Sequence, residues 1–156
     1  MTQLWLVPVD EPSFQQTLAQ PVDLSEQSAK PDSFPDRTRV WGVRTDPERG
    51  GGGERNMRAL EQIETGDPLV IYRNQTSRYH AIGRVSEFWH TTHVRDVYWD
   101  GGPALDVFAV EDYQTIDIEN EDLNSMLGYK TEFYPQGLWR VADGRPTEKV
   151  VRSLPF

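Results

Sequence analysis

The sequence contains no cysteine, few lysines and histidines, and no long hydrophobic run. The missing cysteines exclude disulfide bonds, thiolate nucleophiles and cysteine-ligated zinc. No segment approaches the roughly 20 apolar residues that a membrane-spanning helix requires. The first residues also lack the basic and hydrophobic regions of a secretion signal. We therefore expect a soluble, cytoplasmic protein with no membrane partner.

Positive charge is scarce as well. The chain has 16 basic residues against 25 acidic ones, and its formal charge of −9 argues against unspecific binding to nucleic acid. Only Lys30, Lys130 and Lys149 are lysines, so the basic residues are nearly all arginine. An acidic, lysine-poor chain is also typical of a halophilic cytoplasm, where the screening length is only about 3 Å at 1 M salt. On that interpretation the net charge says little about partners.

What is present indicates one globular domain covering residues 1–156, with 37% hydrophobic and 11% aromatic residues. We expect strands at 4–9, 40–44, 69–73, 79–88, 94–99, 104–113 and 138–141. Short helices are expected at 13–20, 55–63, 121–127 and 146–154, and a polar surface loop at 21–38. The order predicts an α+β fold, a small curved mixed sheet or open β-barrel of about five to six strands flanked by short helices.

The chain has five tryptophans, which is many for its length. A single tryptophan usually belongs to the core, but two indole faces at strand ends can sandwich a planar base. Trp41 and Trp99 both end expected strands next to loops, and Trp89 also lies at a strand end. These three are the candidates for an aromatic pocket.

A glycine-rich segment, RTDPERGGGGER at residues 44–55, separates the Trp41 strand from the following helix. It lacks the Lys-Ser/Thr pair of a Walker A loop and the glycine spacing of a dinucleotide-binding fold. Two interpretations stay open. The segment is a flexible insertion, or it is a loop whose backbone and whose Arg44, Arg49 and Arg55 hold phosphates.

No catalytic or metal-binding constellation stands out. His90 and His93 are three residues apart, which on an extended segment directs them to opposite faces, and no third ligand has supporting spacing. No nucleophile elbow is present. Glu119, Glu121 and Asp122 are most simply a solvated surface in so acidic a chain. We therefore predict no catalytic residue, no metal and no cofactor.

A series of motifs between residues 4 and 118 carries a family resemblance. In chain order they are Trp41-Gly42-Val43-Arg44, a short helix, the Gly66-Asp67 turn, a strand ending in Tyr72-Arg73-Asn74, and the returning strand HAIGRVSEFW. In these features the chain resembles the EVE and YTH-like branch of the PUA-like fold. The resemblance implies a non-catalytic reader of modified bases. Such readers bind a methylated or hydroxymethylated base, for example 5-methylcytosine flipped out of DNA, or N6-methyladenine in RNA.

The resemblance also implies residue roles. Trp41 matches one wall of the aromatic pocket and Trp99 lies near the position of the second wall, with Trp89 as its competitor. The main chain of Gly42 and Val43 is expected to read the base edge. Tyr72 and Asn74 are expected beside it, at the end of their strand. The residues expected to hold flanking phosphates are Arg44, Arg49, Arg55 and Arg73.

Two other expectations come from related groups. The tail FYPQGLWRV at 133–141 resembles the end of EVE-like modules attached to modification-dependent restriction endonucleases. This implies a nuclease or motor as partner, and a chain that is either a stand-alone reader or a fragment of such an enzyme. The related ASCH group implies the alternative of a small ribonuclease or nucleotide hydrolase, with a cluster drawn from Tyr72, Arg73, Glu87 and His90. A protein-interaction module with core tryptophans is the third possibility.

Overall fold

The computed structural model describes residues 3–27, 30–44, 51–90 and 105–156. Within these ranges, seven strands form one mixed sheet in the order β2-β3-β6-β5-β4-β1-β7, and this described sheet does not close on itself. The strands are β1 (Trp5–Val9), β2 (Val22–Asp23), β3 (Arg37–Arg44), β4 (Pro68–Arg73), β5 (Arg78–His90), β6 (Leu105–Glu119) and β7 (Trp139–Arg140). Five of these are longer than two residues. The expected α+β fold with a curved mixed sheet is confirmed.

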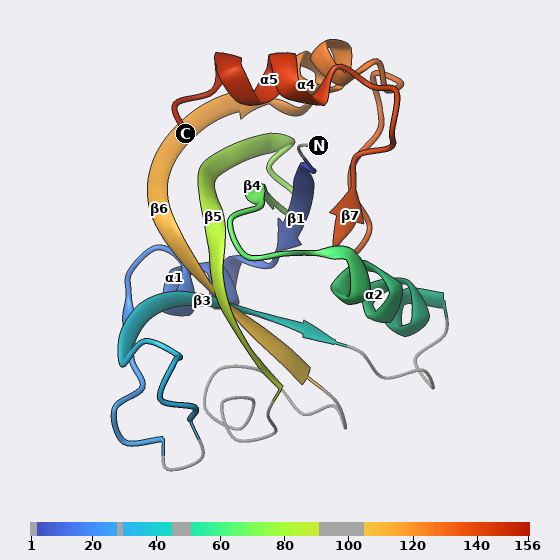
Figure 1. Ribbon diagram of the computed structural model, residues 1–156. Helices are drawn as coiled ribbons and strands as arrows, with labels where there is room; N and C mark the ends of the chain where they lie inside the picture. Colours follow the sequence, from blue (N-terminus) through green and yellow to red (C-terminus); the bar gives the residue numbers. More distant parts are fainter. Residues whose placement is uncertain (1–2, 28–29, 45–50, 91–104) are drawn as a thin grey trace.

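The helices in these ranges are short and lie around the sheet (Figure 1). They are α1 (Glu11–Thr17), α2 (Gly51–Gln62), α4 (Asn120–Leu127) and α5 (Thr147–Ser153). Asp10 begins α1 earlier than expected, because its carboxylate accepts a hydrogen bond from the Ser13 N–H at 3.1 Å. None of the described helices is long and apolar enough to cross a membrane.

The helix α2 begins within the segment that the sequence predicts as a glycine-rich loop. Gly51, Gly52 and Gly53 form its first turn, although glycine is less favourable than alanine in a helix by about 1 kcal/mol. The amphipathic run that follows buries Ala59, whose exposed fraction is 7%. Ile63, directly after the helix, exposes 6%. The packing of this face stabilises the helix beyond its local propensity.

The pairing of the strands follows the expected hairpin and extends it. β4 and β5 are antiparallel and joined by the turn at residues 74–77, whereas β1 pairs in parallel with β4. β6 runs without interruption from Leu105 to Glu119, beyond the end of the strand expected at 104–113. The strand expected at 94–99 lies outside the described residues.

Two irregular positions bend β5 and β6 around the core. A Cβ atom on Gly83 would lie 2.4 Å from Val110 Cγ1, so only glycine allows β6 to approach this closely. Opposite it, the register shifts between Ile82 and Arg84, and Asp112 adopts a φ of 53°. Such a bulge increases the local twist of a strand, and Figure 1 shows both strands curving strongly across the molecule.

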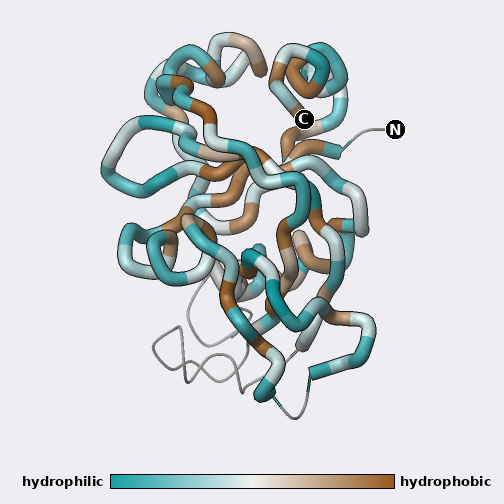
Figure 2. The backbone as a smooth tube through the Cα atoms, turned by 90° about the vertical axis from the view of Figure 1, so that its left-hand side faces the viewer, coloured by the Kyte–Doolittle hydropathy of each residue, from teal (hydrophilic) through white to brown (hydrophobic). Residues whose placement is uncertain are grey.

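The sheet separates two main hydrophobic clusters. The first includes Trp5, Trp41 and Phe108, and helices α1 and α2 contribute Phe14 and Ala59 to it. The second lies on the other face; its buried members are Leu4, Leu6, Val70, Tyr72, Tyr79, Ile82, Leu123, Leu127, Val141, Val150 and Leu154, several of them from α4 and α5. Figure 2 shows the hydrophobic segments gathered along the strands between the two groups of helices.

A third cluster corrects the expectation of a polar surface loop at residues 21–38. β2 pairs with the start of β3, and Leu24 and Phe34 expose 0% and 1% of their surface. The Phe34 ring lies 5.6 Å from the ring of Trp89. The loop is therefore part of the core, because its few apolar residues cover the outer face of β3, β5 and β6.

The Gly66-Asp67 turn is held by one carboxylate. Asp67 Oδ2 accepts hydrogen bonds from Trp5 Nε1 at 2.9 Å, from Gln3 Nε2 at 3.0 Å and from the Glu64 N–H at 2.9 Å. These contacts join β1, the segment after α2 and the start of β4. The motif that carries part of the family resemblance is thus a structural junction.

Candidate nucleic-acid interface

Three aromatic residues lie in register across the centre of the sheet. Phe108 on β6 is paired with Trp41 on β3 and with Phe88 on β5. Directly opposed residues of antiparallel strands project to the same face, so the three form one row, called here the aromatic row. The exposed fraction is 8% for Trp41, 1% for Phe108 and 37% for Phe88. The row therefore passes from the core to the surface.

Beside this row, one edge of β3 is not paired with any strand that the structure describes. β2 pairs only with Arg37 and Thr38, and within the described ranges no strand pairs with that edge of β3 farther along. Gly42 and Val43 pair with β6 on the other edge, opposite Val107 and Asp106. An edge strand presents N–H and C=O groups that a ligand can use. The edge matches the expectation that this main chain reads a base, an expectation that stays a prediction.

Trp41, in the interior of β3, and Trp89, near the end of β5, are not brought together. Trp89 is paired with Val107, and Trp89 and Trp41 belong to clusters on opposite faces of the sheet. Trp89 exposes 5% and packs against Phe34, as a core residue does. Trp99, the other expected wall, lies outside the described residues, and its pairing with Trp41 stays a prediction.

The residues expected at the end of the aromatic strand lie elsewhere. Tyr72 exposes 6% and packs against Tyr79, with ring centroids 5.2 Å apart, in the cluster beneath α4 and α5. Asn74 is exposed, and its N–H donates to the Val9 carbonyl at 2.9 Å. Its side chain lines a cavity of about 1030 Å³ between the β4–β5 turn and the segment at 131–137. The structure does not bring either residue to the aromatic row.

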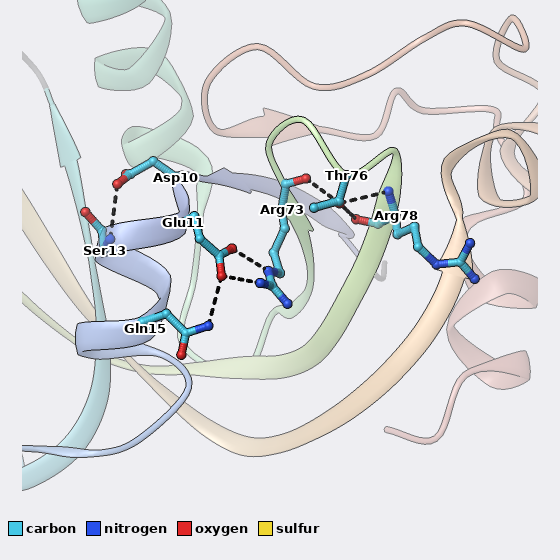
Figure 3. Close-up of polar contacts among 7 residues, drawn as sticks. All are labelled: Asp10, Glu11, Ser13, Gln15, Arg73, Thr76 and Arg78. Carbon is cyan, nitrogen blue, oxygen red and sulfur yellow. Dashed lines mark hydrogen bonds and ion pairs between the residues drawn. The ribbon is translucent and has the colours of Figure 1, made fainter.

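The arginines expected to hold phosphates are also dispersed. Arg73 Nε donates to Glu11 Oε2 at 2.8 Å (Figure 3). The Arg73 guanidinium lies 4.7 Å above the Phe14 ring. Hydrogen bonds from Arg73 and Gln15 lower the pKa of Glu11, so the ion pair is charged at neutral pH. Arg55 donates to the Gln136 carbonyl at 3.1 Å. Arg49 and the side chain of Arg44 lie outside the described residues.

The cluster expected for a hydrolase is divided as well. Tyr72 pairs with Tyr79 near the start of β5, whereas Glu87 lies eight residues farther along the same strand. Strand residues advance by about 3.3 Å each, so these side chains are far apart. The side chain of His90 lies outside the described residues. Arg73 is instead grouped with residues that the sequence analysis did not single out.

That second group lines a cavity of about 640 Å³, called here the arginine pocket; its walls include Phe14, Arg39, Arg73, His80, Tyr113 and Thr115. Arg39 lies two residues before Trp41 on β3, and period-two spacing alone could have placed it on the Trp41 face. No sequence signal places Tyr113 there, because it directly follows the bulge at Asp112.

The acidic residues near the end of β6 do meet. Glu119, Glu121 and Asp122 bring ligand atoms within 4.8 Å of one another, and all three are exposed. Arg78 Nη1 already donates to Glu119 at 3.2 Å. Their exposure and this ion pair agree with the interpretation of a solvated surface.

No protein-family model matches the chain, and a search of curated proteins finds no match. Among solved structures, the YTH domain of Zygosaccharomyces rouxii MRB1 in complex with N6-methyladenosine RNA has a TM-score of 0.56 at 11% identity, over 97% of this chain and 86% of that one. The Pho92 YTH domain in complex with m6A has a TM-score of 0.59 at 12% identity, over 99% and 84%. ASCH from Zymomonas mobilis has a TM-score of 0.56 at 14% identity, over 96% and 94%.

The chain shares the fold of YTH and ASCH domains. Both groups have the PUA-like fold, so the expectation of a PUA-like architecture is supported at this level. Identities of 11–14% show the fold alone.

Proposed function

We propose that this chain is a nucleic-acid-binding reader that holds a modified base at the aromatic row, with Trp41 and Trp99 as the two walls of the pocket. Two of the similar folds are YTH domains whose structures contain m6A or N6-methyladenosine RNA. The proposal extends that use of the fold to this chain. A methylated or hydroxymethylated base in DNA is the first ligand to test, and N6-methyladenosine in RNA is the second.

The observation that carries the proposal is the aromatic row and its gradient of exposure. Phe88 presents an exposed ring at the surface, and Phe108 connects it to Trp41. Stacking a base on an aromatic side chain contributes about 1–3 kcal/mol. The edge of β3 that no described strand pairs with lies beside the row and supplies polar groups for the edge of the base.

The burial of Trp41 sets a condition on this mechanism. Its exposed fraction of 8% leaves little of the indole face open, whereas Phe88 offers 37%. A base therefore stacks first on the Phe88 end of the row, and contact with Trp41 requires neighbouring side chains to move. Extruding a base from a duplex costs a few kcal/mol, least for a mismatched or single-stranded base.

The test is binding to matched fluorescent duplexes that contain cytosine, 5-methylcytosine, 5-hydroxymethylcytosine, adenine or N6-methyladenine, with the same sequences as single-stranded RNA. Measurements at low and at molar salt separate phosphate contacts from base contacts, because only the former weaken with counterion competition. We expect at least a tenfold preference for one modified base, about 1.4 kcal/mol, which Trp41→Phe reduces and Trp41→Ala abolishes.

The matched control is Trp139→Ala, a half-buried tryptophan on β7 outside the aromatic row. It should retain the preference. Circular dichroism and urea unfolding establish that each variant is folded. Equal binding to all duplexes and RNAs by the wild-type chain would contradict the proposal.

A second candidate function is hydrolysis of RNA or nucleotides. The observation that favours it is the grouping of Arg73, His80 and Tyr113 in one cavity, on a fold shared with ASCH from Z. mobilis. Incubation with RNA and with nucleoside triphosphates in the presence of EDTA tests it. Turnover that His80→Gln abolishes would favour the hydrolase over the reader, and absence of turnover would exclude metal-independent hydrolysis of these substrates.

A further inference from the structure

The arginine pocket has an unusual charge for this protein. The chain carries a formal charge of −9, yet the residues that line this cavity include two arginines and a histidine and no carboxylate. A cavity with one sign of charge raises the local concentration of ions of the opposite sign. This pocket is therefore suited to an anion.

Within the part of the chain that the structure describes, no carboxylate offsets the charge of Arg39. Its Nε atom donates to the Leu18 carbonyl at 2.8 Å, and its guanidinium lies 4.2 Å from the centroid of the Tyr113 ring. Within the described residues it forms no ion pair. The bond and the ring fix the guanidinium plane. No hydrogen bond joins its two terminal nitrogens to another described residue, so both can bind a ligand. Bidentate recognition by such a fixed fork is the geometry that phosphate oxygens require.

Arg73 and His80, the other two basic residues that line the arginine pocket, also favour an anion. Glu11 forms an ion pair with Arg73 and offsets its charge. Arg73 therefore contributes N–H donors in fixed positions and little net charge. His80 Nε2 is buried and has no hydrogen-bond partner in the part of the chain that the structure describes. A buried polar atom without a partner costs about 1–3 kcal/mol, and an oxyanion that accepts a hydrogen bond from it would remove that cost.

We propose that the arginine pocket binds a phosphate group, held by the Arg39 guanidinium on β3 and by a hydrogen bond that His80 on β5 donates to a phosphate oxygen. The phosphate belongs either to a nucleic-acid backbone or to a free phosphate or mononucleotide. Arg39 is two residues from Trp41, about 7 Å along the strand, so a backbone phosphate beside a base at the aromatic row reaches it. The site does not depend on the base-reading proposal, since it rests on the pocket alone.

The experiment is a titration of the ¹⁵N-labelled full chain with inorganic phosphate at constant pH and ionic strength, followed by NMR. We expect saturable shifts at the amides of Arg39, His80 and Tyr113. Arg39→Gln should weaken binding at least tenfold, and Arg39→Lys should retain part of it. Arg152→Gln removes the same charge from an exposed position on α5 and should leave the affinity unchanged.

Two results would overturn the proposal. One is the absence of saturable shifts in the wild-type chain, and the other is equal binding by Arg39→Gln in a variant whose spectrum shows a folded chain. Competition by an unmodified DNA duplex or a single-stranded RNA identifies the source of the phosphate. An oligonucleotide that displaces phosphate indicates the backbone, and one that does not indicates a free phosphate or mononucleotide. Base preference plays no part in this measurement, so failure of the reader proposal is detected separately.

Discussion

The aromatic row and the arginine pocket begin two residues apart on β3 but are built in different ways. The row is a product of regular pairing, because Trp41, Phe108 and Phe88 are opposed across three strands. The pocket forms where pairing is irregular, at the bulge beside Tyr113 and under α1. One region offers apolar ring surface and the other offers charge. A nucleotide has a base that stacks on a ring and a phosphate that binds a positive charge. β3 supplies a ring at Trp41 and a positive charge at Arg39, on the same face of the sheet.

The structure also separates the residues at the end of β4, which the sequence had predicted to act together at one site. The sequence predicted Tyr72 and Asn74 beside the base-reading main chain, and Arg73 at a flanking phosphate. In the structure Tyr72 packs beneath α4 and α5, Asn74 lines the large cavity at the β4–β5 turn, and only Arg73 lines the pocket that contains Arg39. A ligand that occupies both regions therefore contacts β3 at Trp41 and Arg39, and reaches the end of β4 only through Arg73.

The largest expected effect comes from Asp67→Ala, which should weaken both regions together. It removes the acceptor of three hydrogen bonds and leaves the buried Trp5 indole N–H unpaired. We expect the free energy of unfolding to fall by about 2–4 kcal/mol. Urea unfolding measures this change, and both base binding and phosphate binding should decline in proportion to the unfolded fraction.

The control is Asp143→Ala, which removes an exposed carboxylate with one ion pair to Arg140. Its cost should stay within about 0.5 kcal/mol. If Asp67→Ala cost no more than this control, the turn would not be the junction that its contacts indicate.

Much of the fold was predictable because it follows local patterns. The β4–β5 hairpin, the Gly66-Asp67 turn, and the helices at α4 and α5 lie close to their expected ranges, since alternation and turn residues specify them. The β3 strand was predicted in the same way. The residues that determine these elements lie close to one another in the sequence.

The site was harder to predict because it depends on register. A shift between Val85 and Phe88 decides that Phe88 faces the Trp41 side and Trp89 the opposite side. A one-residue change in pairing moves a side chain to the other face, and no periodicity in the sequence reveals a bulge. The same holds for Tyr113 in the pocket. Phe34 adds a tertiary reason, since it covers Trp89 from a segment that reads as a loop.

The next largest effect should weaken binding at the aromatic row and leave binding at the arginine pocket unchanged. Phe88→Ala removes the exposed end of the aromatic row, and we expect binding of the preferred modified base to fall by about 1–3 kcal/mol. Phosphate binding at Arg39 should not change, because Phe88 does not line the arginine pocket. Met126→Ala is the matched control, since Met126 on α4 is 38% exposed. Equal affinities for Phe88→Ala and the wild-type chain would show that the row is not a stacking surface.

The smallest effect should appear at the pocket alone, as a dependence of stability on pH. Burial first, and then the charge of Arg73, lowers the pKa of His80 below its ordinary value of 6.5. Arg78 acts in the same direction, whereas Asp117 and Glu11 oppose it. The unfolded chain thus binds the proton more readily, so this stabilisation is present at pH 7 and is lost as pH falls from about 6.5 through the lower folded pKa.

The measurement is the free energy of unfolding in urea at pH 7, 6 and 5, for the wild-type chain and for His80→Gln. The difference between them should shrink as the pH falls, because every other titratable group is common to both chains. Added phosphate should reduce this dependence, since an anion beside His80 favours its protonated form. Parallel curves for the wild-type chain and His80→Gln would mean that His80 does not resist protonation. Parallel wild-type curves with and without phosphate would mean that His80 does not face a bound anion, and the pocket would then rest on Arg39 alone.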